Sequence, residues 1–229
     1  MSVEAAAGVV LIVAPLWFNA NFALLGKRFE YPDILRRPTS EILERFRAGG
    51  SSLILLWWTF MVSGLLLIAA AVLLGQVLGF EGIVPLATTF GVLAGLVQML
   101  GLLRWVYVVP ALARAYADPT LGPEQREAHA AVFRALHQYL GVGVGEHLGY
   151  LFTGIWSLLI GIAVIGDGTA LPVWVGWPGI VIGSGLVIGS AEFLGPNEER
   201  GWSVAGTAIP ILYIAWSVWL LAMGIALVA

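Results

Sequence analysis

The sequence predicts an all-α, polytopic membrane protein whose single transmembrane domain, residues 1–229, is a bundle of six transmembrane helices. Of the 229 residues, 59% are hydrophobic and only 11% are charged, and the mean hydropathy is +0.92. A soluble domain carries about 25% charged residues, so this chain lacks the polar surface that water requires. Six apolar runs reach the length of about 20 residues that crosses the hydrocarbon as a helix. These runs cover about residues 5–25, 53–78, 83–108, 139–165, 172–194 and 202–228.

The loop after the first span is the most charged part of the chain, and it contains an amphipathic segment at about 39–48. Glu41 and Arg45 have the i,i+4 spacing of a helical ion pair. Ile42 and Phe46 share a face of the same helix. We therefore expect this cytoplasmic segment to lie on the membrane surface.

A second amphipathic cytoplasmic segment, at about 123–138, starts with Pro123 at a first helical position and continues into the fourth span. A continuous helix over 123–165 is about 64 Å long, roughly twice the hydrocarbon thickness. Its first part must therefore lie outside the bilayer. The glycines between Gly141 and Gly145 predict a bend where it enters.

The basic residues predict the orientation of the chain. All eleven lie in or beside the first, third and fifth loops, and the termini and the other two loops have none. The positive-inside rule places such loops in the cytoplasm. The first residues, MSVEAAAGVV, lack the basic region of a signal peptide, which favours a retained helix. We expect a multi-pass protein of the bacterial cytoplasmic (inner) membrane with both termini outside.

In this orientation, polar side chains gather in one leaflet. Four spans place them in their inner halves, whereas the outer halves carry almost no ionisable group. Such groups are costly in lipid and usually face the bundle interior or a wet cavity. A cavity open towards the cytoplasm is therefore expected. Its candidate ligand-binding residues are Asn19, Asn21, Gln98, Arg104, His137, Glu146, His147, Tyr150 and Glu192.

The pair Glu146 and His147 is central to this set. Neighbours on a helix point about 100° apart, so each needs a separate partner. Arg104 is a candidate charge partner for the carboxylate, and Tyr150 lies four residues after it. The functional interpretation is a protonatable group that holds a ligand or transfers a proton. The structural alternative is a Glu–Arg bridge between two helices, with His147 bonded to a carbonyl.

Composition and spacing exclude several chemistries. The chain has no cysteine, and its net charge of −3 indicates no nucleic-acid partner. The three histidines lie on one stretch of helix, which disfavours a bis-histidine haem and predicts no metal site. A single-histidine haem or a quinone stays open, although no cofactor is predicted. Gly141, Gly145 and Gly149 form a small-residue face for helix packing, through which a homo-oligomer is possible.

Four segments resemble a bacterial membrane family known as domain of unknown function 4386. They are YPDILRRPTSEILERFRAGGSSLILLWW (31–58), LGLLRWVYVVPALARAYADP (100–119), YLGVGVGEHLGYLFTGIW (139–156) and GSAEFLGPNEERGW (189–202). The resemblance implies a six-helix inner-membrane protein. It carries no assigned activity and no catalytic residues.

Three functions are compatible with these observations. The first is binding or transport of a small amphipathic molecule in a cavity of the cytoplasmic leaflet, surrounded by the lipid bilayer. The second is an intramembrane enzyme or a haem or quinone redox protein that uses Glu146 and His147. The third is a structural or accessory membrane subunit whose polar residues fix helix packing.

Overall fold

The computed structural model describes residues 2–166 and 170–229, apart from the side chains of residues 198 and 199, and its elements are all helical. Six of its helical segments are long and apolar enough to cross a membrane, which confirms the predicted fold class. The elements, in chain order, are α1 (Val3–Phe29), η1 (Asp33–Arg36), α2 (Thr39–Val77), α3 (Val84–Tyr116), α4 (Pro123–Leu136), η2 (His137–Leu148), α5 (Gly149–Gly166), η3 (Val173–Val175), α6 (Gly176–Gly189), η4 (Ser190–Phe193), α7 (Pro196–Arg200) and α8 (Ser203–Val228).

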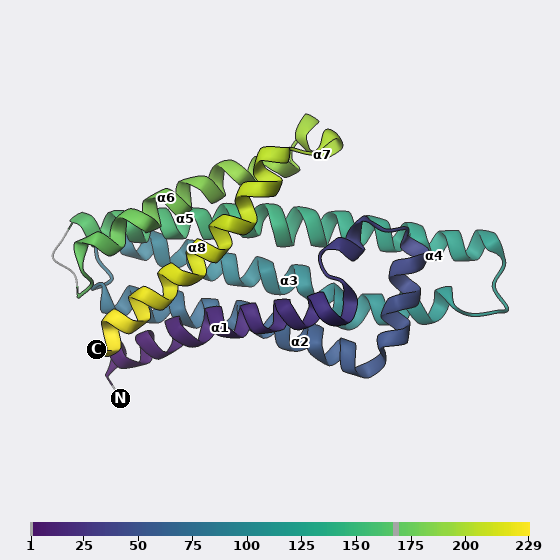
Figure 1. The fold of residues 1–229 in the computed structure, drawn as a ribbon, viewed down its shortest axis with the longest axis horizontal. Coiled ribbons are helices and arrows are strands. Elements are labelled where there is room, and N and C mark those ends of the chain that lie inside the picture. Colours follow the sequence, from purple (N-terminus) through teal and green to yellow (C-terminus); the bar gives the residue numbers. More distant parts are fainter. Residues whose placement is uncertain (1, 167–169) are drawn as a thin grey trace.

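The six spans run up and down along the long axis of the molecule (Figure 1). The two chain ends lie together at one end of the bundle. The connections after α1, α3 and α6 lie at the opposite end, which we call the basic end because these connections and the helix segments that lead to and from them carry the lysine and arginines of the chain. An even number of spans returns the chain to the side on which it started, so both chain ends lie at the same end of the bundle.

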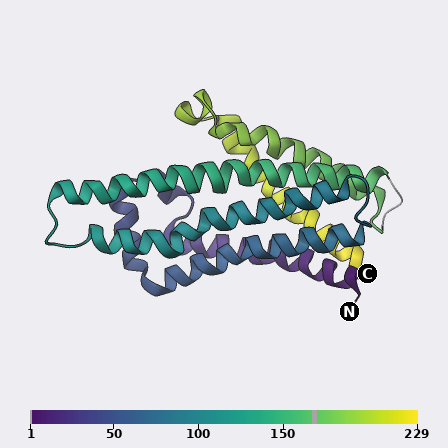
Figure 2. The same cartoon turned by 180° about the vertical axis from the view of Figure 1, so that it is seen from behind.

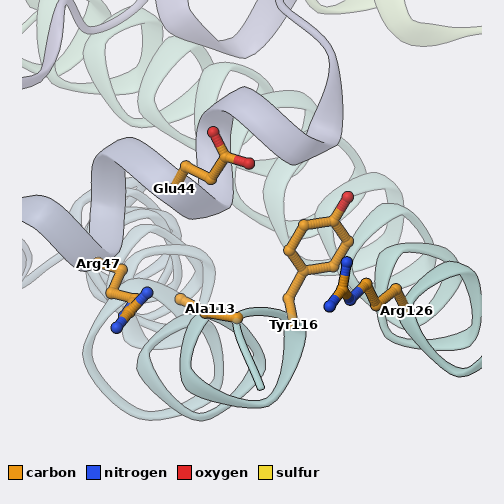
Figure 3. Close-up of a pocket in the computed structure, with 6 residues that line it drawn as sticks. Glu44, Arg47, Ala113, Tyr116 and Arg126 are labelled. Atoms are coloured by element: carbon orange, nitrogen blue, oxygen red, sulfur yellow. The ribbon is translucent and has the colours of Figure 1, made fainter. Parts of the chain in front are cut away.

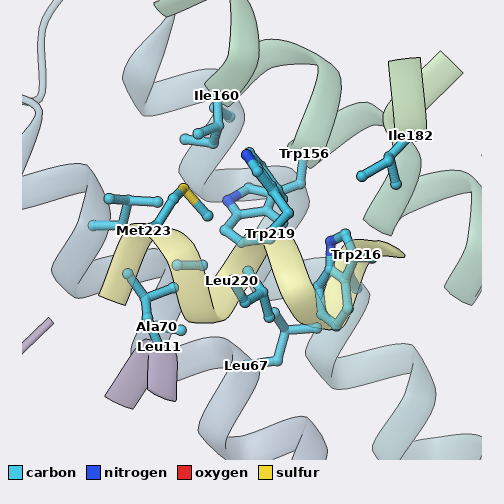
Figure 4. Close-up of a cluster of buried hydrophobic side chains, with 14 of the residues drawn as sticks. Leu11, Leu67, Ala70, Trp156, Ile160, Ile182, Trp216, Trp219, Leu220 and Met223 are labelled. Carbon is cyan, nitrogen blue, oxygen red and sulfur yellow. The ribbon is translucent and has the colours of Figure 1, made fainter. Parts of the chain in front are cut away.

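The bundle has two cores. Near the chain ends, side chains of α1, α2, α5, α6 and α8 pack around Trp156 and Trp219, whose ring centroids are 6.0 Å apart (Figure 4). Nearer the basic end, a second core is aromatic. Trp57 and Trp105 stack there with centroids 4.6 Å apart, and Phe29 meets both edge-on. Such aromatic pairs stabilise beyond their buried area.

The amphipathic segment at 39–48 is helical but does not lie on lipid. Ile42 and Phe46 are buried in the aromatic core, so this part of the prediction is wrong. Gly50, with φ 56° and ψ −154°, turns the chain between this segment and the rest of α2. The turn folds the apolar face back onto α1 and α3, because those helices extend beyond the span and still offer apolar surface. The predicted pair of Glu41 and Arg45 forms at 3.0 Å.

The long helix before the fourth span is continuous through α4, η2 and α5. Figure 2 shows no sharp bend along it, so the bend that we expected near Gly141 is wrong. The chain instead widens into π-helical turns over η2. On α4 the buried residues are Ala130 and Phe133, the latter within 6.1 Å of the Trp105 ring centroid.

Close helix contacts depend on glycine. A Cβ on Gly183 would lie 2.6 Å from the carbonyl oxygen of Gly154, so α5 and α6 pack backbone to backbone. A Cβ on Gly101 of α3 would lie 2.6 Å from the Cα of Gly145. The glycine face of residues 141, 145 and 149, which we considered for a second copy of the chain, is thus covered by α3 of the same chain.

Candidate functional site

Arg104 lies on α3, one turn after the Gly101 contact. Its side chain is buried, with 5% of its surface exposed. It donates to the carbonyl oxygen of Gly101, and its Nη2 lies 3.4 Å from Nδ1 of His137. Its guanidinium carbon lies 5.2 Å from the ring centroid of Trp105. Its Nε is buried without a hydrogen-bond partner, and no acid lies within 4.0 Å among the described residues. This cation therefore has unused hydrogen-bonding capacity inside the bundle.

Glu146 faces the same region from the π-helical turns of η2. Among the described residues its carboxyl oxygens have no hydrogen bond and no ion pair. Arg104 is the nearest source of opposite charge and interacts with it electrostatically, from beyond 4.0 Å. The Glu–Arg bridge of the structural alternative is therefore not formed. π-Helical turns are rare and occur frequently at functional sites.

Three tyrosines complete the surroundings of Glu146. Tyr31 follows α1, Tyr150 lies on α5 and Tyr213 on α8, and the charge of Glu146 reaches all three hydroxyl groups. The rings of Tyr150 and Tyr213 are 5.3 Å apart, and Tyr31 packs 5.1 Å from Trp57. Burial, with the carboxylate of Glu146, raises the pKa of Tyr31 above its usual range, so this hydroxyl stays protonated at neutral pH and can donate a hydrogen bond. We call these three residues, with Arg104 and Glu146, the Arg104–Glu146 cluster.

His147 points away from this cluster, as its place next to Glu146 requires. Its Nδ1 donates to the carbonyl oxygen of Ser190 at 2.9 Å, which attaches η2 to η4. This is the carbonyl bond of the structural alternative. Glu192 is half-buried on η4 and interacts electrostatically with Glu146 and with Arg36. Glu192 thus borders the cluster from the side of the basic end.

The predicted amides hold helices together elsewhere. Gln98 of α3 donates to Thr153 of α5 at 3.1 Å. Asn19 donates to Ser217 of α8 at 3.0 Å, and Asn21 accepts a 2.7 Å bond from Thr59 of α2. Among the described residues, no hydrogen bond joins either asparagine to Glu146.

A cavity of about 20 Å³ lies among α1, α2, α3 and α8. Ser63, Gln98 and Tyr213 give it polar groups, and apolar side chains including Phe18 and Leu67 form the rest of the lining. One water molecule needs about 10–15 Å³, so this cavity is of water size. Tyr213 joins it to the Arg104–Glu146 cluster.

Sequence reasoning found Arg104, His137, Glu146 and Tyr150 but missed Tyr31 and Tyr213. Tyr213 had a visible signal, since it lies in the middle of an apolar span, away from the interfaces where tyrosine is usual. Tyr31 had none, because only the folding of the first loop over α2 brings it to Trp57. The assembled cluster offers a cation, a carboxyl and hydroxyl groups within apolar walls, which suits recognition of a polar head attached to an apolar body.

Comparisons with known proteins give one match. The model of the family described as Domain of unknown function (DUF4386) matches residues 6–224. No curated protein and no solved structure matches the chain. The match covers all six spans and confirms the resemblance found in the sequence. The protein is therefore a multi-pass membrane protein that belongs to the family described as Domain of unknown function (DUF4386).

Proposed function

We propose that this protein binds a small amphipathic molecule in the cytoplasmic leaflet of the bacterial inner membrane, as a binding or transport protein. The basic end then faces the cytoplasm and both termini lie outside, in line with the positive-inside rule. The polar head of the ligand lies between Arg104 and Glu146, and its apolar body lies along the aromatic side chains near them. The distribution of the eleven basic residues supports this orientation.

The proposal rests on two opposite charges, Arg104 and Glu146, that form no ion pair with each other. Arg104 is buried and Glu146 half-buried, yet the two are more than 4.0 Å apart and neither has an ion pair among the described residues. Polar groups without partners are costly away from water. A head group with both an acceptor and a donor satisfies both side chains at once. A phosphoethanolamine head has this chemistry, with its phosphate for Arg104 and its ammonium for Glu146.

The surroundings of the pair support entry from the lipid. Figure 1 shows α1 and α8 next to each other at the chain ends and apart at the basic end. At the chain ends their backbones touch at Gly8 and Gly224. Phe18 of α1 still contacts Tyr213 of α8, with ring centroids 6.4 Å apart. Phe22, one turn further, is exposed at its side, which suits contact with an acyl chain.

A fluorescent lysolipid tests the proposal. The probe is lysophosphatidylethanolamine with a dansyl group at the end of its acyl chain, added to the purified protein in dodecyl maltoside. Tryptophan-to-dansyl energy transfer, from the neighbouring Trp57 and Trp105, should saturate with the probe. Glu146→Gln and Arg104→Gln should each weaken binding about ten-fold or more, the usual loss for one charge-assisted hydrogen bond. Asn19→Ala, outside the cluster, is the matched control.

Stability measurements separate binding from a purely structural role. If the two side chains only support folding, Glu146→Gln and Arg104→Leu should each lower the melting temperature, and the double variant should restore it. The proposal predicts that Glu146→Gln has the melting temperature of the wild type but no longer binds the probe. Non-saturable energy transfer, or equal transfer in all variants, contradicts the proposal.

A further inference from the structure

A larger cavity lies outside the Arg104–Glu146 cluster, at the basic end of the molecule (Figure 3). Its volume is about 290 Å³, close to the lower end of the range for small-molecule sites. Three helices contribute its walls: the first turns of α2, the last turns of α3 and the start of α4. The residues that line it are Glu44, Arg47, Ala113, Tyr116, Ala117 and Arg126.

Two guanidinium groups of this cavity lack acidic partners. Neither Arg47 nor Arg126 has an acid within 4.0 Å among the described residues. Arg126 donates from Nη2 to the carbonyl oxygen of Asp118 at 3.3 Å, and its buried Nε has no hydrogen-bond partner within the described ranges.

The carboxylate of Asp118, which interacts electrostatically with Arg126, already accepts two hydrogen bonds. The side chain of Asp118 accepts from the hydroxyl of Thr120 at 2.7 Å and from its backbone N–H at 2.9 Å. These two bonds, with a smaller effect of Arg126, hold the pKa of Asp118 below its usual range. Both bonds fall on Oδ1, and among the described residues no carboxylate oxygen of Asp118 lies within 4.0 Å of the Arg126 guanidinium, which is therefore available for an anion.

The depth of the cavity indicates which ligands reach it. Along the axis of α3, Tyr116 lies about 48 Å from Val84, at 1.5 Å per residue. The hydrocarbon is about 30 Å thick, so the cavity lies beyond it, among head groups or in water. The neighbouring cation of Arg47 is exposed to the same medium.

From these observations we infer that this cavity binds a phosphate-bearing anion that also carries a hydroxyl or amino group. Guanidinium groups bind phosphate through paired, charge-assisted hydrogen bonds. Arg47 and Arg126 provide them from two helices, and the hydroxyl of Tyr116 is a further donor. Glu44 on the same wall disfavours a bare multivalent anion and accepts a hydrogen bond from the hydroxyl or amino group. The same chemistry occurs in water-soluble phosphate esters and in phospholipid head groups.

Two binding experiments on the full chain distinguish these sources. In the first, equilibrium dialysis measures [³²P]glycerol 3-phosphate bound to lipid-free protein in dodecyl maltoside. In the second, native mass spectrometry measures phosphatidylglycerol bound to the same sample. Saturable binding of about one molecule per chain is expected. Binding in the first experiment identifies a soluble ester, binding in the second alone identifies a lipid head group, and no saturable binding in either overturns the inference.

Variants connect the binding to this cavity. Arg126→Gln and Arg47→Gln should each weaken it about ten-fold or more. The matched control is Arg114→Gln, an exposed arginine of α3 that does not line the cavity, and its affinity should stay within about two-fold. A melting temperature equal to that of the wild type shows that each variant is folded. If Arg126→Gln does not fold, the binding affinity of Arg47→Gln alone tests the inference. Equal losses in all three variants show nonspecific attraction and overturn the inference.

Discussion

The contact between Gly101 of α3 and Gly145 of η2 yields the sharpest test of the packing beside the cluster. In Gly101→Ala the new Cβ would lie 2.6 Å from the Cα of Gly145 and 3.0 Å from the carbonyl oxygen of Leu140. The optimal separation of two nonbonded carbon atoms is about 3.5–4.0 Å. Both obstacles are backbone atoms that no rotamer change can move, so α3 and η2 must separate by about 1 Å.

Such overpacking costs about 1–3 kcal/mol, against a gain of about 1 kcal/mol for replacing a helical glycine by alanine. Gly143→Ala on the same π-helical turns is the matched control, because its Cβ would meet only the carbonyl oxygen of Gln138, at 3.6 Å. The propensity gain is common to both variants, so Gly101→Ala should be less stable than Gly143→Ala by about 1–3 kcal/mol.

Reversible unfolding by sodium dodecyl sulfate in mixed micelles, followed by tryptophan fluorescence, measures this difference. Binding of the dansyl lysolipid should also fall in Gly101→Ala, because the shift moves Arg104 relative to Glu146. If Gly101→Ala proves as stable as Gly143→Ala, the close approach of α3 and η2 is refuted, and with it the placement of Arg104 next to Glu146.

Two further predictions concern other parts of the bundle. Trp216→Phe removes the 2.9 Å bond from Nε1 to Ser157, whereas Nε1 of the buried Trp156 has no partner in the described part of the chain. Trp216→Phe should therefore lose about 1 kcal/mol more in unfolding free energy than Trp156→Phe, and equal losses contradict this. Arg45 beside Glu30 holds the pKa of that carboxyl below its usual value of 4.5, so its stabilising contribution is present above that value and disappears as the pH falls through the lowered pKa. Glu30→Gln should accordingly melt below the wild type at pH 7, and this gap should narrow as the pH falls below 4.5. A gap that does not change with pH excludes this pairing.

The sequence by itself determined the class of the fold. Six continuous apolar runs of about 20 residues satisfy their backbone in lipid as spanning helices, because the other solution, a closed β-barrel, uses alternating strands of about 10 residues. Charged side chains are costly to place in the membrane, so the positions of the basic residues in alternate loops also identified the basic end of the bundle. Helix periodicity predicts that Glu146 and His147 point apart, and in the structure His147 bonds to the carbonyl oxygen of Ser190 while Glu146 interacts electrostatically with Arg104.

Only the tertiary structure decided which surfaces meet. The apolar stripe of Ile42 and Phe46 has the same pattern whether it faces lipid or protein, and the turn at Gly50 directs it to the aromatic core. Arg104 and Glu146 were recognised as possible partners, but their separation depends on the rotation of α3 against η2, which local sequence does not encode. Tyr31 reaches the site through the fold of a loop. The cavity of Arg47 and Arg126 combines the start of α2 with the connected ends of α3 and α4, which lie far from it in the chain. Such sites arise from packing between distant segments, so their residues carry no local pattern that could reveal them in advance.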